Sequence, residues 1–218
     1  MRQIALTILL LTASLAWGQA AANANSGYKT KEDRERVAKT LSAEDRDSRQ
    51  KPKELVAAMG LKPGMTVADL GTGVGYMLPY LSQAVGPEGN VFAEDIHDDF
   101  LDKAKATAEK AKLKNVRFFL GTERDPKLPE ASVDAILTLD AYHHFDYPSE
   151  MLAGIRHALK DGGRLVLVDF YKRGFRDPAH IRLDDDGVIK EVEANGFKFI
   201  NKHDHIPNSQ YMAVFEKK

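Results

Sequence analysis

The sequence predicts a doubly wound α/β domain, with seven strands in a mostly parallel sheet, helices on both faces and a C-terminal antiparallel β-hairpin. Two observations lead to this fold class. Between residues 62 and 170, five short apolar runs rich in β-branched residues alternate with segments of helical character, which is typical of right-handed βαβ crossovers. Two strand-like runs then follow each other, joined only by Pro-Asn-Ser, which favours a hairpin on the sheet edge.

The individual elements have local signals at their boundaries. Pro52 stands in the first turn of an apolar helical segment and Gly60 just past its end, the asymmetry that helices favour. The turns GPEGN and DGG end two of the later helical segments. Strands are expected at residues 65–70, 91–96, 115–121, 133–139, 164–170, 197–206 and 210–217, and helices at 52–59, 76–85, 98–112, 149–160 and 184–196.

Composition limits the function classes that the chain can serve. Of its 218 residues, 43% are hydrophobic and 29% charged, and the formal net charge is −1, so no excess of positive charge favours nucleic acid or an anionic membrane. The chain has no Cys, which excludes disulfides, thiol catalysis and cysteine-ligated metal sites. We therefore expect one globular domain over residues 52–218, with no nucleic-acid partner; the oligomeric state is not predicted.

The N-terminus has the layout of a secretory signal peptide. MRQIALTILLLTASLAWGQA combines an Arg, an apolar run and small residues at Ala16 and Gly18. The run is shorter than the roughly 20 apolar residues that a membrane span needs. We expect a signal peptide over residues 1–18, with cleavage as late as about residue 24, and export to the periplasm or beyond, leaving no membrane span. An uncleaved chain would be cytoplasmic or membrane-associated.

Residues 19–51 form a charged arm whose apolar positions are sparse. The segment from Tyr28 to Lys51 reads as an exposed helix followed by a linker. A second interpretation is that the arm folds over a pocket as a lid and excludes water from it.

The first predicted strand of the domain runs into a glycine loop, VADLGTGVGY. Gly71, Gly73 and Gly75 allow a sharp turn and close approach of a ligand to the backbone. A dinucleotide fingerprint would need its third Gly at Tyr76, so the spacing disfavours a nicotinamide cofactor. Asp69 would also repel a pyrophosphate and attract an ammonium group.

Carboxylates follow the next two strands, at the sheet edge where ligands of such folds bind. Asp95, with Glu94 as the alternative, ends the second strand and is placed to accept hydrogen bonds from ribose hydroxyls. Asp125, after the third strand, is placed to accept from an exocyclic amine.

In this combination the chain resembles the class I S-adenosylmethionine-dependent methyltransferases, from about Pro52 to its end. VADLGTGVGY resembles the family's D-x-G-x-G-x-G motif, VFAEDI its second motif and GTERDPKLPEASVD its third, although Pro126 and Lys127 are extra there. LTLDAYHHF and LKDGGRLVLVDF resemble the fourth and fifth. The resemblance implies a Rossmann-like fold, S-adenosylmethionine as the cofactor, and a cofactor site made of Asp69, Gly71, Thr72, Gly73, Gly75, Asp95, Ile96, Thr122, Glu123, Asp125 and Asp140.

The segment DAYHHFDYP follows the fourth strand and resembles small-molecule methyltransferases that act on quinone precursors. Methyl transfer is an in-line displacement, for which the protein aligns the acceptor and, for a weak nucleophile, removes a proton. His143 or His144 is a candidate base, and Asp140 a candidate partner of the sulfonium charge. Alternatively, one His caps the next helix, the other packs on the sheet, and alignment alone suffices.

Two further sets of residues carry weaker signals. His203 and His205 alternate on a predicted strand and could form half a metal site, but no third ligand is evident, so we expect no metal. The loop after the fifth strand carries Arg173, Arg176, His180 and Arg182, which would either recognise an acidic group or be solvated.

The sequence thus favours methyl transfer from S-adenosylmethionine to a small-molecule acceptor. Methylation of isoaspartate in proteins and binding of the cofactor without catalysis are the alternatives. An exported enzyme of this type must obtain a cofactor that is made in the cytoplasm.

Overall fold

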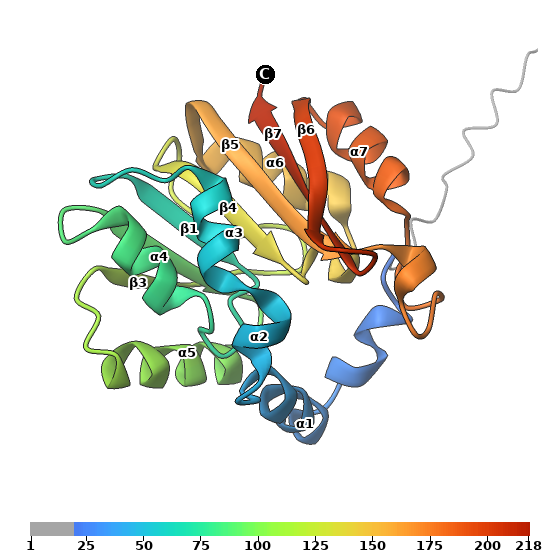
Figure 1. Cartoon of the computed structure of the whole chain (residues 1–218), viewed down its shortest axis with the longest axis horizontal. Coiled ribbons are helices and arrows are strands. Elements are labelled where there is room, and N and C mark those ends of the chain that lie inside the picture. Colours follow the sequence, from blue (N-terminus) through green and yellow to red (C-terminus); the bar gives the residue numbers. More distant parts are fainter. Residues whose placement is uncertain (1–19) are drawn as a thin grey trace, which may run out of the picture.

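The computed structural model describes residues 20–218, and the expected signal peptide at 1–18 lies outside the described residues. The seven strands form one sheet in the order β3-β2-β1-β4-β5-β7-β6 (Figure 1). The first five strands are parallel, and β7 lies antiparallel between β5 and β6. The strands are β1 Thr66–Leu70, β2 Asn90–Asp95, β3 Val116–Leu120, β4 Val133–Leu139, β5 Leu159–Phe170, β6 Phe197–Ile206 and β7 Gln210–Lys217. The predicted fold class and hairpin are confirmed.

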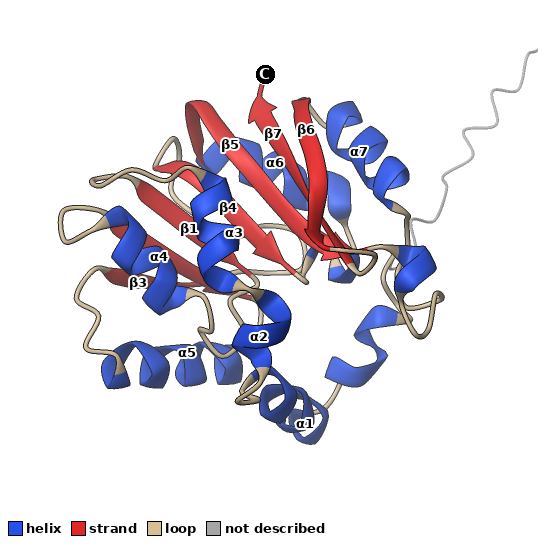
Figure 2. Ribbon diagram, viewed as in Figure 1, coloured by secondary structure: helices blue, strands red, loops and turns tan. Residues whose placement is uncertain are grey.

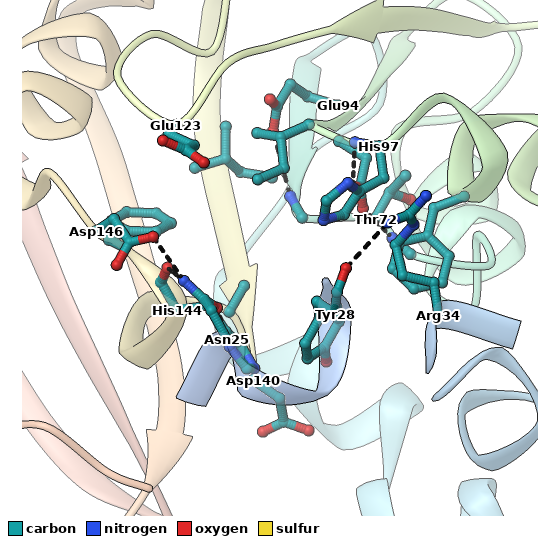
Figure 3. Close-up of a pocket in the computed structure, with 18 of the residues that line it drawn as sticks. Asn25, Tyr28, Arg34, Thr72, Glu94, His97, Glu123, Asp140, His144 and Asp146 are labelled. Carbon is teal, nitrogen blue, oxygen red and sulfur yellow. Dashed lines mark hydrogen bonds between the residues drawn. The ribbon is translucent and has the colours of Figure 1, made fainter. Parts of the chain in front are cut away.

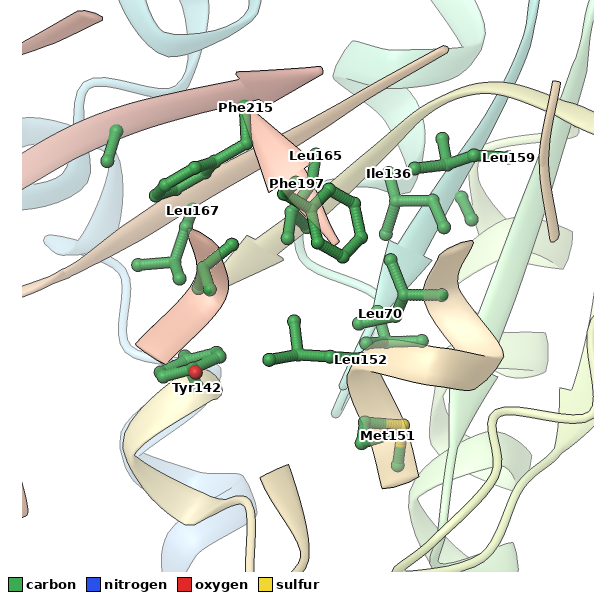
Figure 4. Close-up of a cluster of buried hydrophobic side chains, with 14 of the residues drawn as sticks. Leu70, Ile136, Tyr142, Met151, Leu152, Leu159, Leu165, Leu167, Phe197 and Phe215 are labelled. Carbon is green, nitrogen blue, oxygen red and sulfur yellow. The ribbon is translucent and has the colours of Figure 1, made fainter. Parts of the chain in front are cut away.

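Helices cover both faces of the sheet (Figure 2). Helices α3, α4 and α5 contribute to one apolar cluster, and α6 and α7 to the other, which Figure 4 shows. Their bounds are α1 Lys31–Leu41, α2 Arg46–Gln50, α3 Pro52–Met59, α4 Leu78–Val85, α5 Asp98–Lys110, α6 Pro148–Ala158 and α7 Asp185–Ala194. No helix within residues 20–218 combines the length and apolar character needed to cross a bilayer.

The continuous apolar runs of the central strands follow from this two-sided cover. In β1, Val67 belongs to one cluster and Ala68 to the other, and both are fully buried. Full burial of one large apolar side chain stabilises a fold by about 1.5–3 kcal/mol. In a strand that is covered on both sides, an apolar side chain therefore contributes to stability at nearly every position. The clusters hold the carboxyl ends of β1, β2 and β4 in fixed register, and the candidate site described below lies there.

The largest difference from the predicted boundaries lies between α6 and β5. Helix α6 ends at Ala158, and β5 begins at Leu159 instead of Arg164, because Leu159 pairs with Val133 of β4. The register then shifts between Val133 and Ala135, which accommodates the DGG turn within β5.

The N-terminal arm packs against the domain. It consists of a short 3₁₀ helix, Ala24–Tyr28, followed by α1 and α2. Arg34 forms an ion pair with Asp99 of α5 at 2.9 Å, and Ala38 is buried in a small cluster with Val74 and Phe100. The arm thus lies across the carboxyl ends of the strands (blue, Figure 1) and takes the position expected of a lid.

Candidate functional site

A cavity of about 350 Å³ lies between the carboxyl ends of β1, β2 and β4 and the N-terminal arm (Figure 3). Its volume is at the lower end of the range for small-molecule sites. Five segments contribute to its wall: the glycine loop after β1, the end of β2 with the start of α5, the segment after β3, the segment after β4, and the arm. The lining residues used below are Asn25, Tyr28, Arg46, Gly71, Thr72, Gly73, Glu94, Asp95, Ile96, His97, Phe100, Glu123, Asp140, His144, Phe145 and Asp146.

The glycine loop is held by hydrogen bonds to the end of β2. The backbone N–H groups of Gly71 and Thr72 donate to the carbonyl oxygen of Glu94 at 3.0 and 2.8 Å, and Gly73 N–H donates to the Asp95 carboxylate at 2.9 Å. Gly71 has φ +75°, and a Cβ there would stand 2.8 Å from the Cβ of Ala141. The loop therefore requires glycine at this position, both for its backbone conformation and for the close approach of the segment after β4.

Acidic side chains gather around the cavity: Asp69, Glu94 and Asp95 are buried, and Asp140 is half-buried. Burial raises the pKa of Asp69 and of Asp95 to about 6 each, and burial together with Asp169 raises the pKa of Asp140 to about 7. Burial also raises the pKa of Glu94 well above its usual range, and Glu94 Oε1 has no hydrogen-bond partner within the described chain. These carboxyl groups are stabilised by donors and positive charge, which a ligand with hydroxyl and ammonium groups supplies.

The raised pKa values predict that binding of a cationic ligand depends on pH. A carboxyl group must lose its proton to pair with an ammonium or sulfonium group, so affinity falls as pH drops through the pKa of that group. For Asp140, with a pKa of about 7, affinity for S-adenosylmethionine should fall about tenfold between pH 8 and pH 6. Calorimetric titration across this range tests it: in Asp140→Asn the decrease should shrink, and an equally steep decrease would contradict the assignment.

Asp140 is held in an unusual backbone conformation at the end of β4. Its φ is +54°, in the left-handed region, and its N–H donates to Val168 O of β5 at 2.9 Å. Its Oδ1 accepts from Gln210 Nε2 at 2.7 Å, and Gln210 Oε1 accepts from Gln50 Nε2 at 2.9 Å. A non-glycine residue in this conformation costs free energy, which the surrounding contacts must offset; such positions gather at functional sites.

The structure separates the roles of the two adjacent histidines. His143 is buried, its backbone N–H donates to Asp169 Oδ2 at 3.0 Å, and its Nδ1 lies 2.7 Å from Asp169 Oδ1; it does not line the cavity. His144 does line the cavity, and its Nδ1 lies 2.8 Å from Asn25 Oδ1 of the arm. Neither residue caps α6, whose N-cap is Tyr147, so the expected capping role is wrong.

The electrostatic surroundings of the two rings also differ. Burial lowers the pKa of His143, but the Asp169 carboxylate outweighs burial, so the pKa ends above its ordinary value. Burial, with His143 and His180 nearby, lowers the pKa of His144 well below its ordinary value. His144 is therefore neutral near pH 7, the form in which a ring nitrogen accepts a proton.

The other predicted cofactor residues divide into two groups. Ile96 and Glu123 line the cavity with the glycine loop, whereas Asp69 lies beneath the loop and accepts from the Thr72 hydroxyl at 2.7 Å. Thr122 and Asp125 are not on the cavity wall: their backbones pair, and Asp125 accepts from Lys127 Nζ at 2.7 Å. Gly75 is likewise absent from the wall, and the cofactor contacts of all these residues stay predictions.

Residues of the arm are the part of the site that the sequence analysis did not identify. Tyr28 and Asn25 face Glu94 and Glu123 across the cavity (Figure 3). Arg46 is lodged over the Tyr76 ring at 4.0 Å; burial lowers its pKa, while Asp140 and Asp69 act in the opposite direction. The positive charge of Arg46 thus partly offsets the negative charge of Asp140 and Asp69. The signal that could have identified these residues in the sequence was the presence of the aromatic Tyr28 and the cationic Arg46 in an otherwise polar arm.

The weaker candidates have other partners. His205 Nε2 lies 2.7 Å from Gln50 O, and His203 is exposed; no metal-binding group within residues 20–218 contains them. In the loop after β5, Arg182 forms an ion pair with Glu191 at 2.5 Å and Arg173 contacts Asp185 at 3.4 Å, so both have partners within the chain.

Comparison with known proteins identifies the domain. A methyltransferase domain family model matches residues 61–212, over two thirds of the chain. The chain belongs to this methyltransferase family. A solved S-adenosylmethionine-dependent methyltransferase from Aquifex aeolicus is 27% identical, with a TM-score of 0.80, and the match covers 84% of this chain and 98% of that one. The predicted family, and S-adenosylmethionine as its cofactor, are confirmed.

Two curated relatives are methyltransferases of different kinds. A ubiquinone/menaquinone biosynthesis C-methyltransferase of Marinomonas sp. is 29% identical over 118 residues, which cover 54% of this chain and 47% of the relative. A protein-L-isoaspartate O-methyltransferase of Pyrococcus horikoshii is 27% identical over 140 residues, covering 64% of this chain and 60% of that one. The chain spans a third to a half of the first curated relatives that it matches.

The residues of this chain fit the cofactor of the methyltransferase family. The glycine loop provides a close-fitting surface in which there is no room for a Cβ at Gly71. The buried Asp95 and Glu94 and the half-buried Asp140 supply acceptors for hydroxyl and ammonium groups. A polyanionic dinucleotide would meet the same buried carboxyls with unfavourable charge.

Proposed function

We propose that this protein transfers a methyl group from S-adenosylmethionine to a small, largely apolar molecule. The observation that carries the proposal is that one cavity joins the expected cofactor residues to the segment after β4 under the N-terminal arm. Aromatic rings form much of the wall near that segment: Tyr28 lies edge-on to His144, with centroids 4.8 Å apart, and Phe145 is adjacent. Such a wall favours an apolar acceptor.

Closure by the arm argues for a small acceptor over a protein. Asn25 Nδ2 donates to the carbonyl oxygen of His144 at 3.0 Å and to the Asp146 carboxylate at 2.9 Å, so the arm is tied to the segment that faces the acceptor. A protein substrate would have to displace this contact to bring a side chain to the reacting centre. A closed site also excludes water, which strengthens every electrostatic interaction within it.

The residues of the chain divide the work of the reaction. Bound S-adenosylmethionine supplies an electrophilic methyl group. The glycine loop and Asp95 orient the cofactor, and Asp140 offsets positive charge. The arm excludes water and confines the acceptor. Neutral His144, at the cavity wall, accepts the proton of the acceptor at its free ring nitrogen, because its other nitrogen is occupied by Asn25.

Replacement of the two histidines separately tests the base role. Since only His144 reaches the cavity, His144→Gln should lower kcat at least about 100-fold, the low end of what a general base contributes. His143→Gln should lower it less than about tenfold. Both are measured with the acceptor once it is identified, in buffer with a chelator. Unchanged kcat in His144→Gln would remove the base role.

The class of acceptor is tested with tritium-labelled methyl groups. Purified protein and labelled S-adenosylmethionine are incubated with extract from the source cells, and the protein precipitate is separated from the organic-soluble fraction. We expect label in the organic-soluble fraction, and none with Gly71→Ala protein. Label in the precipitate, with methylation of an isoaspartyl peptide, would favour the protein-repair alternative. Tight cofactor binding without any labelled product would favour a non-catalytic module.

Export is proposed on the layout of residues 1–18, and the contacts of the following residues limit where cleavage leaves the arm intact. Ala20 N–H donates to Asp146 O at 3.1 Å, and Ala21 N–H to Asp146 Oδ1 at 3.0 Å. Cleavage before Gln19 or Ala20 keeps both contacts, whereas cleavage before Ala21 loses the Ala20 contact but gives a free amine at Ala21 that would form an ion pair with Asp146. N-terminal sequencing of the mature protein should therefore begin at residues 19–21; an intact Met1 would refute export by cleavage.

A further inference from the structure

Three histidines from two distant segments meet beside the cavity. His143 and His144 follow β4, and His180 comes from the loop between β5 and α7. Each ring offers one nitrogen such that all three nitrogens lie within 4.8 Å of one another. The ring centroids are 4.1, 5.1 and 5.6 Å apart. Among residues 20–218, this is the one group of three or more His, Cys, Asp or Glu side chains with such geometry.

The hydrogen bonds of the rings determine which nitrogens are free. His143 Nδ1 lies 2.7 Å from the Asp169 carboxylate, and His144 Nδ1 lies 2.8 Å from Asn25 Oδ1. Both partners are acceptors, so each Nδ1 carries the proton and each Nε2 is left with a lone pair. A carboxylate or amide oxygen behind the imidazole is the arrangement that orients histidine ligands in metal sites and raises their basicity.

Three imidazoles whose nitrogens approach within 4.8 Å in a partly buried place form a group that a shared cation would stabilise. The Asp169 carboxyl group hydrogen-bonded to His143 lies directly behind this cluster, where it favours a cation between the rings. Tetrahedral ligation at about 2.0–2.1 Å requires nitrogens roughly 3.4 Å apart. His180 is half-buried, and its ring stacks on Phe175 with centroids 5.2 Å apart. A small shift of this loop side chain would bring its nitrogen from within 4.8 Å of the other two to the distance that ligation requires.

We propose that His143, His144 and His180 bind one divalent transition-metal ion of the zinc type. Three imidazole ligands with a fourth position left open are typical of zinc sites that bind a further ligand, and imidazole selects such metals over calcium or magnesium. Asp169 and Asn25 are positioning residues for the site. The inference departs from the expectation that the protein holds no metal, and it does not rest on the proposed function.

The location of the site connects metal binding to the cavity. His144 lines the 350 Å³ cavity, and His180 lines a second cavity bounded by residues 20–24 of the arm. A metal ion would take the Nε2 lone pair of His144, which is the same lone pair that the general base requires. The metal-bound and metal-free proteins therefore differ at the acceptor wall, and the histidine comparison above is made with a chelator for this reason.

Cobalt titration tests the site directly, without cofactor or acceptor. The full-length mature protein, purified without a polyhistidine tag and stripped with a chelator, is titrated with Co²⁺ while the visible spectrum is recorded. We expect one Co²⁺ per chain with the intense absorption of a tetrahedral ion, displaced by Zn²⁺. His180→Ala removes a half-exposed ligand, keeps the fold by circular dichroism, and should weaken binding at least about 100-fold. Asp169→Asn should weaken it about 10–100-fold.

Matched controls replace exposed histidines elsewhere. His203→Ala on β6 and His157→Ala on α6 should leave the spectrum and the stoichiometry unchanged. The absence of saturable Co²⁺ or Zn²⁺ binding would overturn the proposal. Binding that His180→Ala and His144→Ala leave within about threefold of wild type, or that His203→Ala abolishes, would overturn it equally.

Discussion

Gly71→Ala should lower the affinity for S-adenosylmethionine at least about 100-fold. The new methyl group would lie 2.8 Å from the Cβ of Ala141, closer than two carbon atoms pack, so either the glycine loop or the segment after β4 must move. Both segments line the cavity. The positive φ of Gly71 adds roughly 1–2 kcal/mol of backbone strain for any other residue. Calorimetric titration gives the affinity, and thermal unfolding gives the cost to stability.

The matched control for this prediction is Gly162→Ala. Gly162 also has a positive φ, +70°, but its added Cβ would meet nothing within 4 Å, and it lies in the DGG turn away from the cavity. The control should lose similar stability from backbone strain and keep its affinity for the cofactor. If Gly71→Ala binds as tightly as Gly162→Ala, the glycine loop does not form the cofactor site.

Asp140→Asn should weaken S-adenosylmethionine binding about 10- to 100-fold. This loss corresponds to one hydrogen bond or ion pair of a charged group, which contributes about 1.5–3 kcal/mol. S-adenosylhomocysteine has no sulfonium charge. A carboxylate next to the sulfonium therefore matters more for S-adenosylmethionine, and its affinity should fall more than that of S-adenosylhomocysteine. Equal losses would place Asp140 at the ammonium group that both ligands share, and no loss would remove it from the site.

In the ligand-free protein, Asp140→Asn should not lower the stability of the fold, although it weakens cofactor binding. With a pKa raised to about 7, Asp140 is ionised at pH 8 at a cost in free energy, and the neutral amide avoids this cost while still accepting from Gln210. The unfolding temperature of the apoprotein at pH 8 should therefore not decrease. Asp134→Asn, at the other end of β4, is the control: it disturbs bonds from Thr66 N–H and Lys160 without touching the cavity.

Local signals were sufficient for the fold and for part of the site. The spacing of Gly71 and Gly73, and the acid at the end of β2, are properties of short segments, and the parallel sheet brings strand ends together without further information. The boundary between α6 and β5 was misplaced because pairing of Leu159 with Val133 is a tertiary contact that no local pattern encodes.

Contacts between distant segments account for what the sequence did not reveal. Tyr28 and Arg46 enter the cavity because the arm packs against α5 and the glycine loop, not because of neighbours in the chain. His180 is separated from His144 by the whole of α6 and β5, so their proximity could not be inferred. Asp125 was expected near the cofactor, but its ion pair with Lys127, one of the two extra residues in that motif, lies outside the cavity wall.

Calorimetric titration of the mature protein with S-adenosylmethionine at pH 8 tests the central claim, that the cavity under the arm is the cofactor site. The structure predicts saturable binding of one S-adenosylmethionine per chain, no binding of a nicotinamide dinucleotide, and loss of the S-adenosylmethionine signal in Gly71→Ala but not in Gly162→Ala. Absence of binding at millimolar S-adenosylmethionine, with the protein shown to be folded, would contradict it.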